Sequence, residues 1–542
     1  MKPTASSASS VPHPAASGVG ESLLNRNRFR FLGLTLDQLI KYFFGGNAFV
    51  AVVVLALITI FLFREGAGFF GQNASNIRLY RLAGLEYVDF IRRQTDEHMA
   101  MNRALSELRL VQFNKLAAAG QTVEEANVAL ENYDAFATAY GDAVVDVRGL
   151  LSDLTDAATA IKEKELVNDN RVVEREQLLA EGKSEAAAAV QIAPVDFAAE
   201  TAVLKGTLPA YRDANRQFAA KLQAALPLAP QLADTAMQRQ TDELKAKTKI
   251  FIATFPEIEK QMEAWRWDEP IPWARSVSSF LFGREWLTAS FWQDWYGLIP
   301  LLCGSLLVSV IALTIAVPLG ISAAIYVSEI AAPREKNFVK PYIEFISAIP
   351  SVVLGFFGIA VLGTALRWLS QQPWLAWVPG FPMSERLNSL TAGCLLALMA
   401  IPTIFSLAED ALTNVPKHFK EGSYALGANR IQTIVRILIP ASLSGIISAI
   451  LLGFGRVIGE TMVVLLCAGN RIAIPDFTQG LGAFTQPVHT MTGIIAQEMG
   501  EVVHGSIHYR ALFMVGIVLF LLSLVINWIA QGLVRRYRIS IG

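Results

Sequence analysis

The stretch that decides the fold is PASLSGIISAILLGFGRVIGETMVVLLCAGN, residues 440–470. It is apolar and long enough to cross a lipid bilayer, which requires about 20 residues of helix. Arg456 and Glu460 lie near its middle. A charged side chain at this depth costs roughly 2.5–3.5 kcal/mol on insertion scales, so it usually faces the interior of a helix bundle and marks a pathway. The stretch therefore predicts a membrane protein with a transmembrane path, and Arg456 indicates that an anion moves along it.

The composition agrees with a membrane protein. Hydrophobic residues make up 53% of the 542-residue chain and charged residues 17%, and the net charge of −1 gives no reason to expect nucleic acid as a partner. Cys303, Cys394 and Cys467 all lie in apolar runs, which argues against a disulfide framework or a thiolate metal site. No histidine spacing matches a metal motif, and the chain holds no complete nucleotide-binding loop. We therefore expect neither a cofactor nor an enzymatic activity.

Six apolar runs are long enough to span a membrane. They lie at about 45–63, 298–319, 343–366, 388–411, 441–468 and 510–533. Basic residues gather before the first run, between the second and third, between the fourth and fifth, and after the sixth. These residues are Arg26, Arg28, Arg30 and Lys41; Arg334, Lys336 and Lys340; Lys417, Lys420, Arg430 and Arg436; and Arg535, Arg536 and Arg538. Because basic loops remain cytoplasmic, the pattern predicts a multi-pass protein of the inner (plasma) membrane with both termini in the cytoplasm.

These runs divide the chain into four parts. We expect a disordered cytoplasmic tail at 1–40, a first transmembrane helix at 41–64, an extracytoplasmic, mostly helical domain at 65–294, and a five-helix membrane core at 295–542. Stretches 104–119 and 160–181 of the third part have the spacing of amphipathic helices. The predicted fold class is all-α and polytopic.

The cytoplasmic segment 413–440 reads TNVPKHFKEGSYALGANRIQTIVRILIP. Pro416 suits the start of a short helix that would run from Lys417 to Leu426, and Gly427 can end that helix with a positive φ. A second short helix would run into Pro440. An exposed helix–turn–helix between two spans is a suitable lever for a cytoplasmic partner, and an ordinary amphipathic loop is the alternative that these residues leave open.

This segment resembles the EAA loop of ABC-importer permeases, in which Glu-Ala-Ala is followed by Gly and then by Ile-x-Leu-Pro. The matching residues are Glu-Gly-Ser at 421–423, Gly427, and Ile-Leu-Ile-Pro at 437–440, with small or conservative differences from the pattern. In that family the loop forms a coupling helix that docks into a cleft on the ATPase subunit. The resemblance implies that the residues which couple this chain to an ATPase are Glu421, Gly422, Ser423, Gly427 and Pro440.

Other stretches resemble the permeases of phosphate importers. They are SFLFGREW at 279–286, residues 298–333, SAIPSVVLGFFGIAVL at 347–362, and GFGRVIGETMVVLLCAGN at 453–470. In the last of these, Gly-Arg-x-x-Gly-Glu-Thr followed by Met is similar to the PstC-type subunit, whereas the PstA-type partner usually has Ala-Pro after that Thr. The resemblance covers about 45–71 and 277–542. Residues 72–276, called the insert below, replace an external loop that is short in PstC-type chains.

The resemblance implies a MetI-like permease core and a function as the transmembrane subunit of an ATP-driven importer of inorganic phosphate. ATP hydrolysis would then belong to another subunit. The partners that it implies are a PstA-like permease, a PstB-like ATPase dimer, a periplasmic phosphate-binding protein, phosphate itself, the lipid bilayer and phosphate-signalling regulators.

Arg456 and Glu460 are four residues apart, so in a continuous helix they would share one face. Gly455 and Gly459 would form an adjacent stripe that lets another helix approach closely. We expect Arg456, Glu460 and Thr461 to line the substrate pathway, where the guanidinium fork binds two phosphate oxygens. Glu460 would keep that binding weak, orient Arg456 or sense the proton of the substrate. The alternative is a buried Arg456–Glu460 pair that only fixes helix register.

The remaining polar residues of the membrane part carry weaker expectations. Pro350 should kink or interrupt a helix. Glu409 should lie at a solvated end of its span, with a contact to the ATPase as the alternative. His489, Glu498 and His508 fall in an external loop that we expect to be solvated, with a gate or a binding-protein contact as the alternative.

Three questions remain open at the level of the sequence. A permease for another oxyanion, such as phosphite, phosphonate or sulfate, would need the same charges. A membrane sensor would share the layout of one span followed by an external helical domain, although it would need neither the EAA loop nor Arg456. The insert could dock the binding protein, cap the external gate, or act as a spacer.

Overall fold

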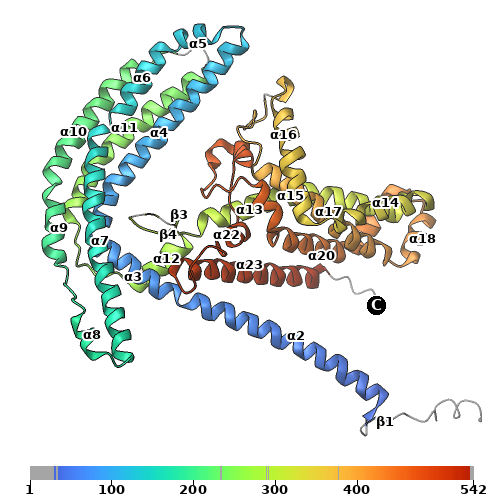
Figure 1. Cartoon of the computed structure of the whole chain (residues 1–542). Coiled ribbons are helices and arrows are strands. Elements are labelled where there is room, and N and C mark those ends of the chain that lie inside the picture. The colour runs from blue at the N-terminus through green and yellow to red at the C-terminus, as the bar shows by residue number, and fades with distance from the viewer. Residues whose placement is uncertain are drawn as a thin grey trace, which may run out of the picture. The chain divides into compact units, whose positions relative to one another are not determined.

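The computed structural model describes residues 30–31, 34–231, 235–288, 290, 292–375 and 377–537 (Figure 1). The predicted tail up to residue 29, the side chain of Arg30, and Arg538 lie outside the described residues. The chain divides into two compact units, Met1–Gly66 and Ala67–Gly542. Each unit is described below by itself.

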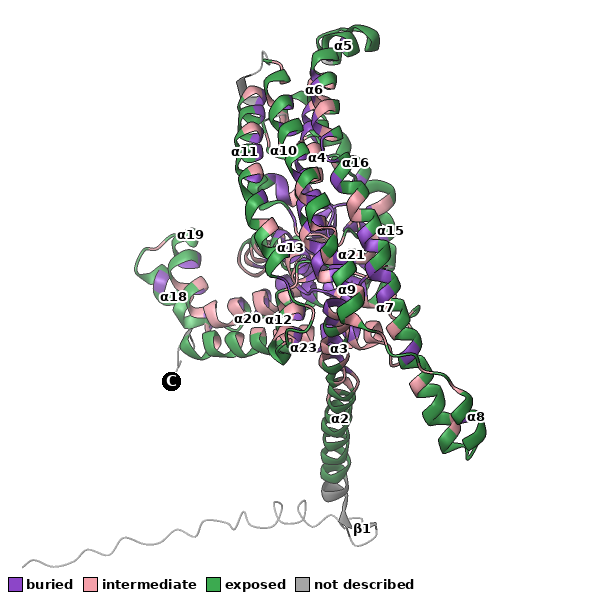
Figure 2. Cartoon of the chain, turned by 90° about the vertical axis from the view of Figure 1, so that its left-hand side faces the viewer, coloured by how far each residue is buried: buried purple, intermediate pink, exposed green. Residues whose placement is uncertain are grey.

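The first unit consists of a small hairpin and one long helix. β1 (Arg30–Phe31) pairs antiparallel with β2 (Leu34–Thr35), and α2 runs over Leu36–Ala67. The apolar window of this helix has no buried residue, and Figure 2 shows most of α2 as exposed. A helix that is apolar all round needs lipid or other helices around it, so α2 suits the first transmembrane span.

The insert is a bundle of helices, as predicted. Its helices are α3 (Phe69–Leu82), α4 (Leu85–Ala118), α5 (Val123–Ala129), α6 (Glu131–Asp142), α7 (Val145–Ala180), α8 (Ser184–Ala189), α9 (Phe197–Gly206), α10 (Leu208–Ala225), η1 (Leu226–Leu228), α11 (Thr235–Ala264) and α12 (Trp273–Leu281). The amphipathic stretches 104–119 and 160–181 lie in α4 and α7. On α10, Tyr211, Phe218 and Leu222 are buried at helical spacing and pack into an aromatic-rich core shared with α4, α6 and α11.

A single carboxylate joins the two ends of the insert. Glu86, at the start of α4, accepts hydrogen bonds from Arg81 of α3 (Nε–Oε2, 2.6 Å) and from Arg275 of α12 (Nη2–Oε1, 2.6 Å). Burial alone would raise the pKa of Glu86, but the two arginine hydrogen bonds outweigh it and lower this pKa to about 2. Arg81 also donates to the backbone oxygen of Glu269 at 3.0 Å, so the chain leaves the insert close to where it enters.

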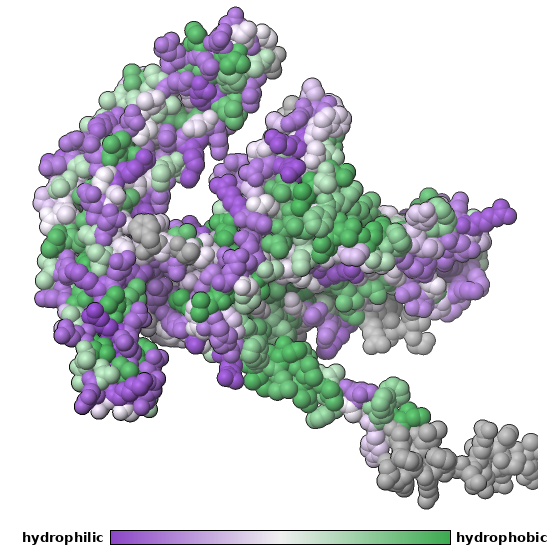
Figure 3. Space-filling model, viewed as in Figure 1, coloured by the Kyte–Doolittle hydropathy of each residue, from purple (hydrophilic) through white to green (hydrophobic). Residues whose placement is uncertain are grey.

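The second unit continues with a hairpin and the membrane core. The elements are β3 (Trp286–Leu287), β4 (Trp295–Tyr296), α13 (Ile299–Ile325), η2 (Tyr326–Ile330), α14 (Pro333–Ala348), α15 (Ser351–Phe357), η3 (Gly358–Leu362), α16 (Gly363–Ser370), η4 (Pro373–Leu375), α17 (Ser389–Thr413), α18 (Lys417–Ala425), α19 (Arg430–Thr433), η5 (Ile434–Leu438), α20 (Ile439–Ile458), α21 (Met462–Cys467), η6 (Phe477–Thr485), α22 (Met491–Glu498) and α23 (Ile507–Tyr537). α13, α17 and α20 pack against one another at the centre. Figure 3 shows hydrophobic residues gathered over this core, whereas the surface of the insert is mostly hydrophilic.

Six helical runs in the described part of the chain are long and apolar enough to cross a membrane. They are Ile40–Leu82, Ile299–Ile330, Ser351–Ser370, Ser389–Thr413, Arg430–Ile458 and Ile507–Arg536. The number of spans and the all-α class therefore agree with the prediction, but several boundaries differ from it, and two of the differences have a clear physical cause or bear on the site. The third span begins at Ser351 because Pro350 separates it from α14, and the residue before a proline disfavours helix. The fifth ends at Ile458 rather than near residue 468.

Candidate functional site

The fifth span breaks at the position where the sequence predicted a continuous helix. α20 ends at Ile458, Gly459 is its C-cap, and α21 starts only at Met462. The Oε1 atom of Glu460 accepts a hydrogen bond from the backbone N–H of Met462 at 3.2 Å, which satisfies one of the free donors at the start of α21. The prediction that Arg456 and Glu460 share one helix face was therefore wrong, because Glu460 and Thr461 lie in the interruption.

Arg456 lies in the last turn of α20 with its side chain exposed. Among the described residues, its side chain has one hydrogen-bond partner, the hydroxyl of Thr403 on α17 at 3.2 Å. Arg456 makes no ion pair with Glu460, so the alternative of a buried structural pair does not hold for the chain alone. The guanidinium keeps most of its donors available to a ligand or to another subunit.

The glycine stripe next to Arg456 is open. A Cβ atom added at Gly455 would meet nothing within 4 Å, and one added at Gly459 would meet only the oxygen of Gly455, at 3.4 Å. Both glycines are exposed. Arg456 therefore lies beside a flat strip of backbone that a second helix can approach closely.

Four hydroxyl residues that the sequence reasoning missed surround the break. Thr492 Oγ1 donates a hydrogen bond to the backbone oxygen of Glu460 at 2.8 Å. The hydroxyl oxygens of Thr490 and Thr492 are 3.3 Å apart. Ser305 of α13 accepts from the N–H of Met491 at 2.9 Å. A small cavity is lined in part by Ser305, Ser309, Glu460, Thr490 and Thr492.

Local signals for these residues do exist. Ser305 and Ser309 are one helical turn apart within an apolar run, and Thr490 is the N-cap of α22, where its hydroxyl accepts from the N–H of Gly493. Gly304 allows the contact between the two elements, since a Cβ there would lie 2.0 Å from the oxygen of His489. The hydroxyl cluster is therefore built by close backbone approach between α13 and the start of α22.

Segment 413–440 forms the predicted short helix. α18 covers Lys417–Ala425 and is followed by Gly427 at φ +82°, as the sequence predicted. The second helix is not a separate one, because α19, η5 and α20 continue through Pro440 as a single run from Arg430 to Ile458. Pro440 fits because it lies in the first turn of α20, where no backbone donor is needed.

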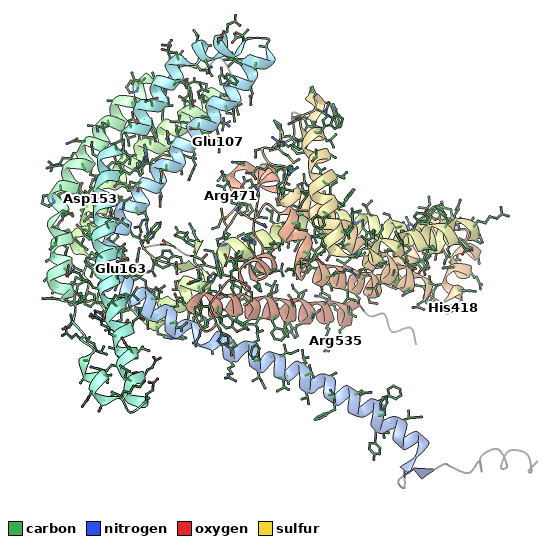
Figure 4. The ribbon with its side chains drawn as sticks, in the orientation of Figure 1. Glu107, Asp153, Glu163, His418, Arg471 and Arg535 are labelled. Carbon is green, nitrogen blue, oxygen red and sulfur yellow. The ribbon has the colours of Figure 1, made fainter. Side chains whose placement is uncertain are left out.

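The inner side of α18 is tied to the membrane core, and its outer side is open. Lys420 pairs with Glu329, at the end of η2, over 2.5 Å (Nζ–Oε1). The buried hydroxyls of Ser423 and Thr433 are 2.9 Å apart. Glu421 and Gly422 are exposed, as are several large apolar side chains of the same loop. These are Phe419, Tyr424, Leu426 and Ile431, of which Leu426 is 91% exposed. Figure 4 labels His418 at this end of the core.

Glu409 is not at a solvated end, so that expectation was wrong. Its side chain is 4% exposed and pairs with Lys340 at 2.8 Å and with Lys336 at 3.4 Å. A buried carboxylate needs such compensation, and here α14 supplies both cations to α17.

The loop that carries His489, Glu498 and His508 was expected to be solvated, and this expectation was wrong for His489. His489 is 1% exposed, and its Nε2 lies 3.0 Å from Gln497 Oε1. Burial lowers the pKa of His489, so the neutral form is favoured. Glu498, at the end of α22, pairs with His508 at 2.7 Å and accepts from the indole N–H of Trp286 at 3.3 Å.

Comparisons with known proteins show which family the chain belongs to. The model of the binding-protein-dependent transport system inner membrane component matches residues 316–539. A probable ABC transporter permease protein YqgH of Bacillus subtilis (strain 168) is 35% identical over 275 residues, which is 49% of this chain and 83% of the relative. The phosphate transport system permease protein PstC of Pasteurella multocida (strain Pm70) is 31% identical over 266 residues, or 48% and 80% of the two chains.

Among solved structures, a chain of the inward-facing MetNI methionine ABC transporter matches with 18% identity and a TM-score of 0.33, covering 44% of this chain and 94% of that one. This likeness is too distant to support an argument. The six membrane helices, the core and the family match define an inner-membrane permease subunit of an ABC importer. The chain belongs to the PstC-type permeases of this family.

Proposed function

We propose that this chain conducts inorganic phosphate across the inner membrane as one half of a heterodimeric permease. The observation that carries the proposal is Arg456, an exposed guanidinium beside the open Gly455 stripe that pairs with no carboxylate among the described residues. A second permease on this strip would enclose Arg456 between the two subunits. In that low-dielectric setting an anion becomes the natural partner of the guanidinium, and the planar fork suits two oxygens of a phosphate.

Glu460, Thr461 and the nearby hydroxyls complete the proposed pathway. Hydroxyl groups can donate to an oxyanion and also accept from it when it is protonated. Glu460 adds a negative charge close to the path, which keeps the binding of a phosphate weak enough for release. The hydroxyl cluster is therefore suited to passing on a partly protonated oxyanion rather than storing it.

The proposed partners are assigned to two surfaces of the chain, the exposed face of α18 and the insert. We propose that the exposed surface of α18 docks on a PstB-like ATPase dimer, with Glu421, Gly422 and Leu426 at the contact, and that both termini are cytoplasmic. The second permease would be PstA-like. A phosphate-binding protein would then deliver substrate from the opposite side, where the insert, as the extracytoplasmic domain, would meet it.

Competition between oxyanions tests the substrate. The four-component complex would be reconstituted in vesicles, and uptake of labelled phosphate would be measured with excess phosphite, methylphosphonate or sulfate outside. We expect unlabelled phosphate to compete and sulfate not to, because a fully ionised sulfate cannot donate a hydrogen bond to Glu460 or to the hydroxyls. Stronger competition by sulfate or phosphonate would assign the chain to that oxyanion instead.

The insert is proposed to dock the loaded binding protein. In a deletion variant, a short Gly/Ser linker joins Leu82 to Glu269, which removes the bundle and keeps α3 and α12. The two joined ends are already close, because Arg81 donates a hydrogen bond to the backbone oxygen of Glu269. We expect normal assembly with the other subunits and roughly tenfold weaker apparent affinity for the binding protein, which corresponds to about 1.4 kcal/mol of lost contact. Uptake would be measured against binding-protein concentration, with subunit stoichiometry as the control. An unchanged concentration dependence would make the insert a spacer, and failed assembly would make it structural.

A further inference from the structure

The β3–β4 hairpin is held by the insert on one side. Lys162 of α7 donates to the backbone oxygen of Trp292 at 2.7 Å and to Gln293 Oε1 at 2.8 Å, and Gln293 is fully buried. The guanidinium of Arg92 lies 4.6 Å from the ring centre of Trp292. The two hydrogen bonds from the Lys162 ammonium group thus anchor the loop of the hairpin to the insert.

The strands of the same hairpin contact the membrane core. Trp286 of β3 donates its indole N–H to Glu498, and Tyr296 of β4 packs against both Trp286 and His508, with ring centres 5.4 Å and 5.8 Å apart. Glu498 also pairs with His508 at the start of α23. The hairpin therefore bridges the insert and the C-terminal end of α22.

The helix α22 leads from this bridge to the break in the fifth span. It is eight residues long, with Glu498 at one end and Thr492 in its first turn. Thr492 holds the backbone oxygen of Glu460, and the adjacent Met491 N–H is held by Ser305 of α13. Because α22 joins these two contacts within eight residues, a shift at Glu498 would reach the backbone at Glu460.

We propose that the β3–β4 hairpin and α22 form a mechanical link through which the insert positions Glu460, with Lys162, Trp286, Glu498 and Thr492 as positioning residues. The link rests on the proposed function only in its consequence for transport. When the insert is displaced by a docked partner, Lys162 displaces the hairpin, and Glu498 carries the movement into α22.

A double-mutant cycle in the full-length chain tests the link. Lys162→Met removes both bonds to the hairpin loop, and Glu498→Leu removes the acceptor for Trp286 and His508. The readout is backbone hydrogen exchange of residues 459–465 in the assembled complex. We expect each single variant to raise this exchange by about 3- to 10-fold, the effect of losing the one hydrogen bond from Thr492 to Glu460, and the double variant to add nothing further. Glu498→Gln, which keeps an acceptor oxygen, should retain much of the protection.

The matched control is Glu501→Leu, which removes an exposed carboxylate three residues further along the same loop and should leave exchange unchanged. Additive effects of Lys162→Met and Glu498→Leu would show two independent structural contacts and overturn the link, as would unchanged exchange in either single variant. Hydrogen exchange does not depend on which anion is carried. A coupled response in a complex that does not import phosphate would therefore reject the proposed function and leave the link intact.

Discussion

Arg456→Gln should lower phosphate uptake by roughly 100-fold while the complex still assembles. Glutamine keeps much of the side-chain volume and the capacity to bond Thr403, but it removes the charge. A hydrogen bond to a charged group contributes about 1.5–3 kcal/mol, and a bidentate contact makes two of them, so a net loss of about 3 kcal/mol is expected. The measurement is initial uptake of labelled phosphate into vesicles at saturating binding protein, normalised to the amount of complex.

Arg456→Lys should recover only part of this loss, because an ammonium is a point charge without the planar fork. The matched control is Arg536→Gln, an exposed arginine in the last turn of α23, which should transport normally. Wild-type uptake by Arg456→Gln would refute the pathway role of Arg456, and loss of assembly in this variant would make it a packing residue.

Gly427→Val should uncouple the ATPase from transport. Gly427 has φ +82°, a conformation that costs a β-branched residue on the order of 1–3 kcal/mol, and the strain would be relieved by unwinding the end of α18. That movement displaces Glu421 and the exposed Leu426, so binding-protein-stimulated ATP hydrolysis should fall about tenfold towards the basal rate. Glu421→Lys should reduce stimulation at the same surface without changing the backbone.

Gly182→Val provides the matched control for strain. Gly182 has φ +76° in the turn between α7 and α8, and a Cβ at either glycine would meet nothing within 4 Å. The two variants therefore carry similar backbone strain in open space, one on the proposed coupling loop and one on the insert. Full stimulation in Gly427→Val, or equal losses in both variants, would contradict the placement of the coupling helix.

The features that the sequence predicted well are those whose causes are local. Apolar runs of about 20 residues identify spans by themselves, and the pattern around Lys417–Gly427 defines a helix and its stop within eleven positions. The break after Ile458 has a different origin. The backbone oxygen of Glu460 in this break is held by Thr492, 32 residues further along the chain, so the immediate sequence offers only Gly459 as a sign that the helix ends there.

The hydroxyl cluster of the candidate site was missed because its contacts join distant parts of the chain. Ser305 and Met491 are 186 residues apart and meet only when α13 packs against α22. The burial of Glu409 depends on two lysines contributed by another helix, α14, whereas the sequence alone showed a charged residue near the end of a span. Contacts of this kind are set by tertiary packing, and single-chain patterns do not record them.

The meeting of Arg81, Glu86 and Arg275 has an evolutionary consequence. A domain whose entry and exit points adjoin can be gained or lost in one genetic event, because the flanking polypeptide keeps its route on either side. The relative from Bacillus subtilis aligns over 83% of its own length with only 49% of this chain, so much of this chain has no counterpart in that alignment. The contacts of Arg81 and Arg275 with Glu86 close the base of the bundle, so a change within the bundle need not alter the course of the flanking chain.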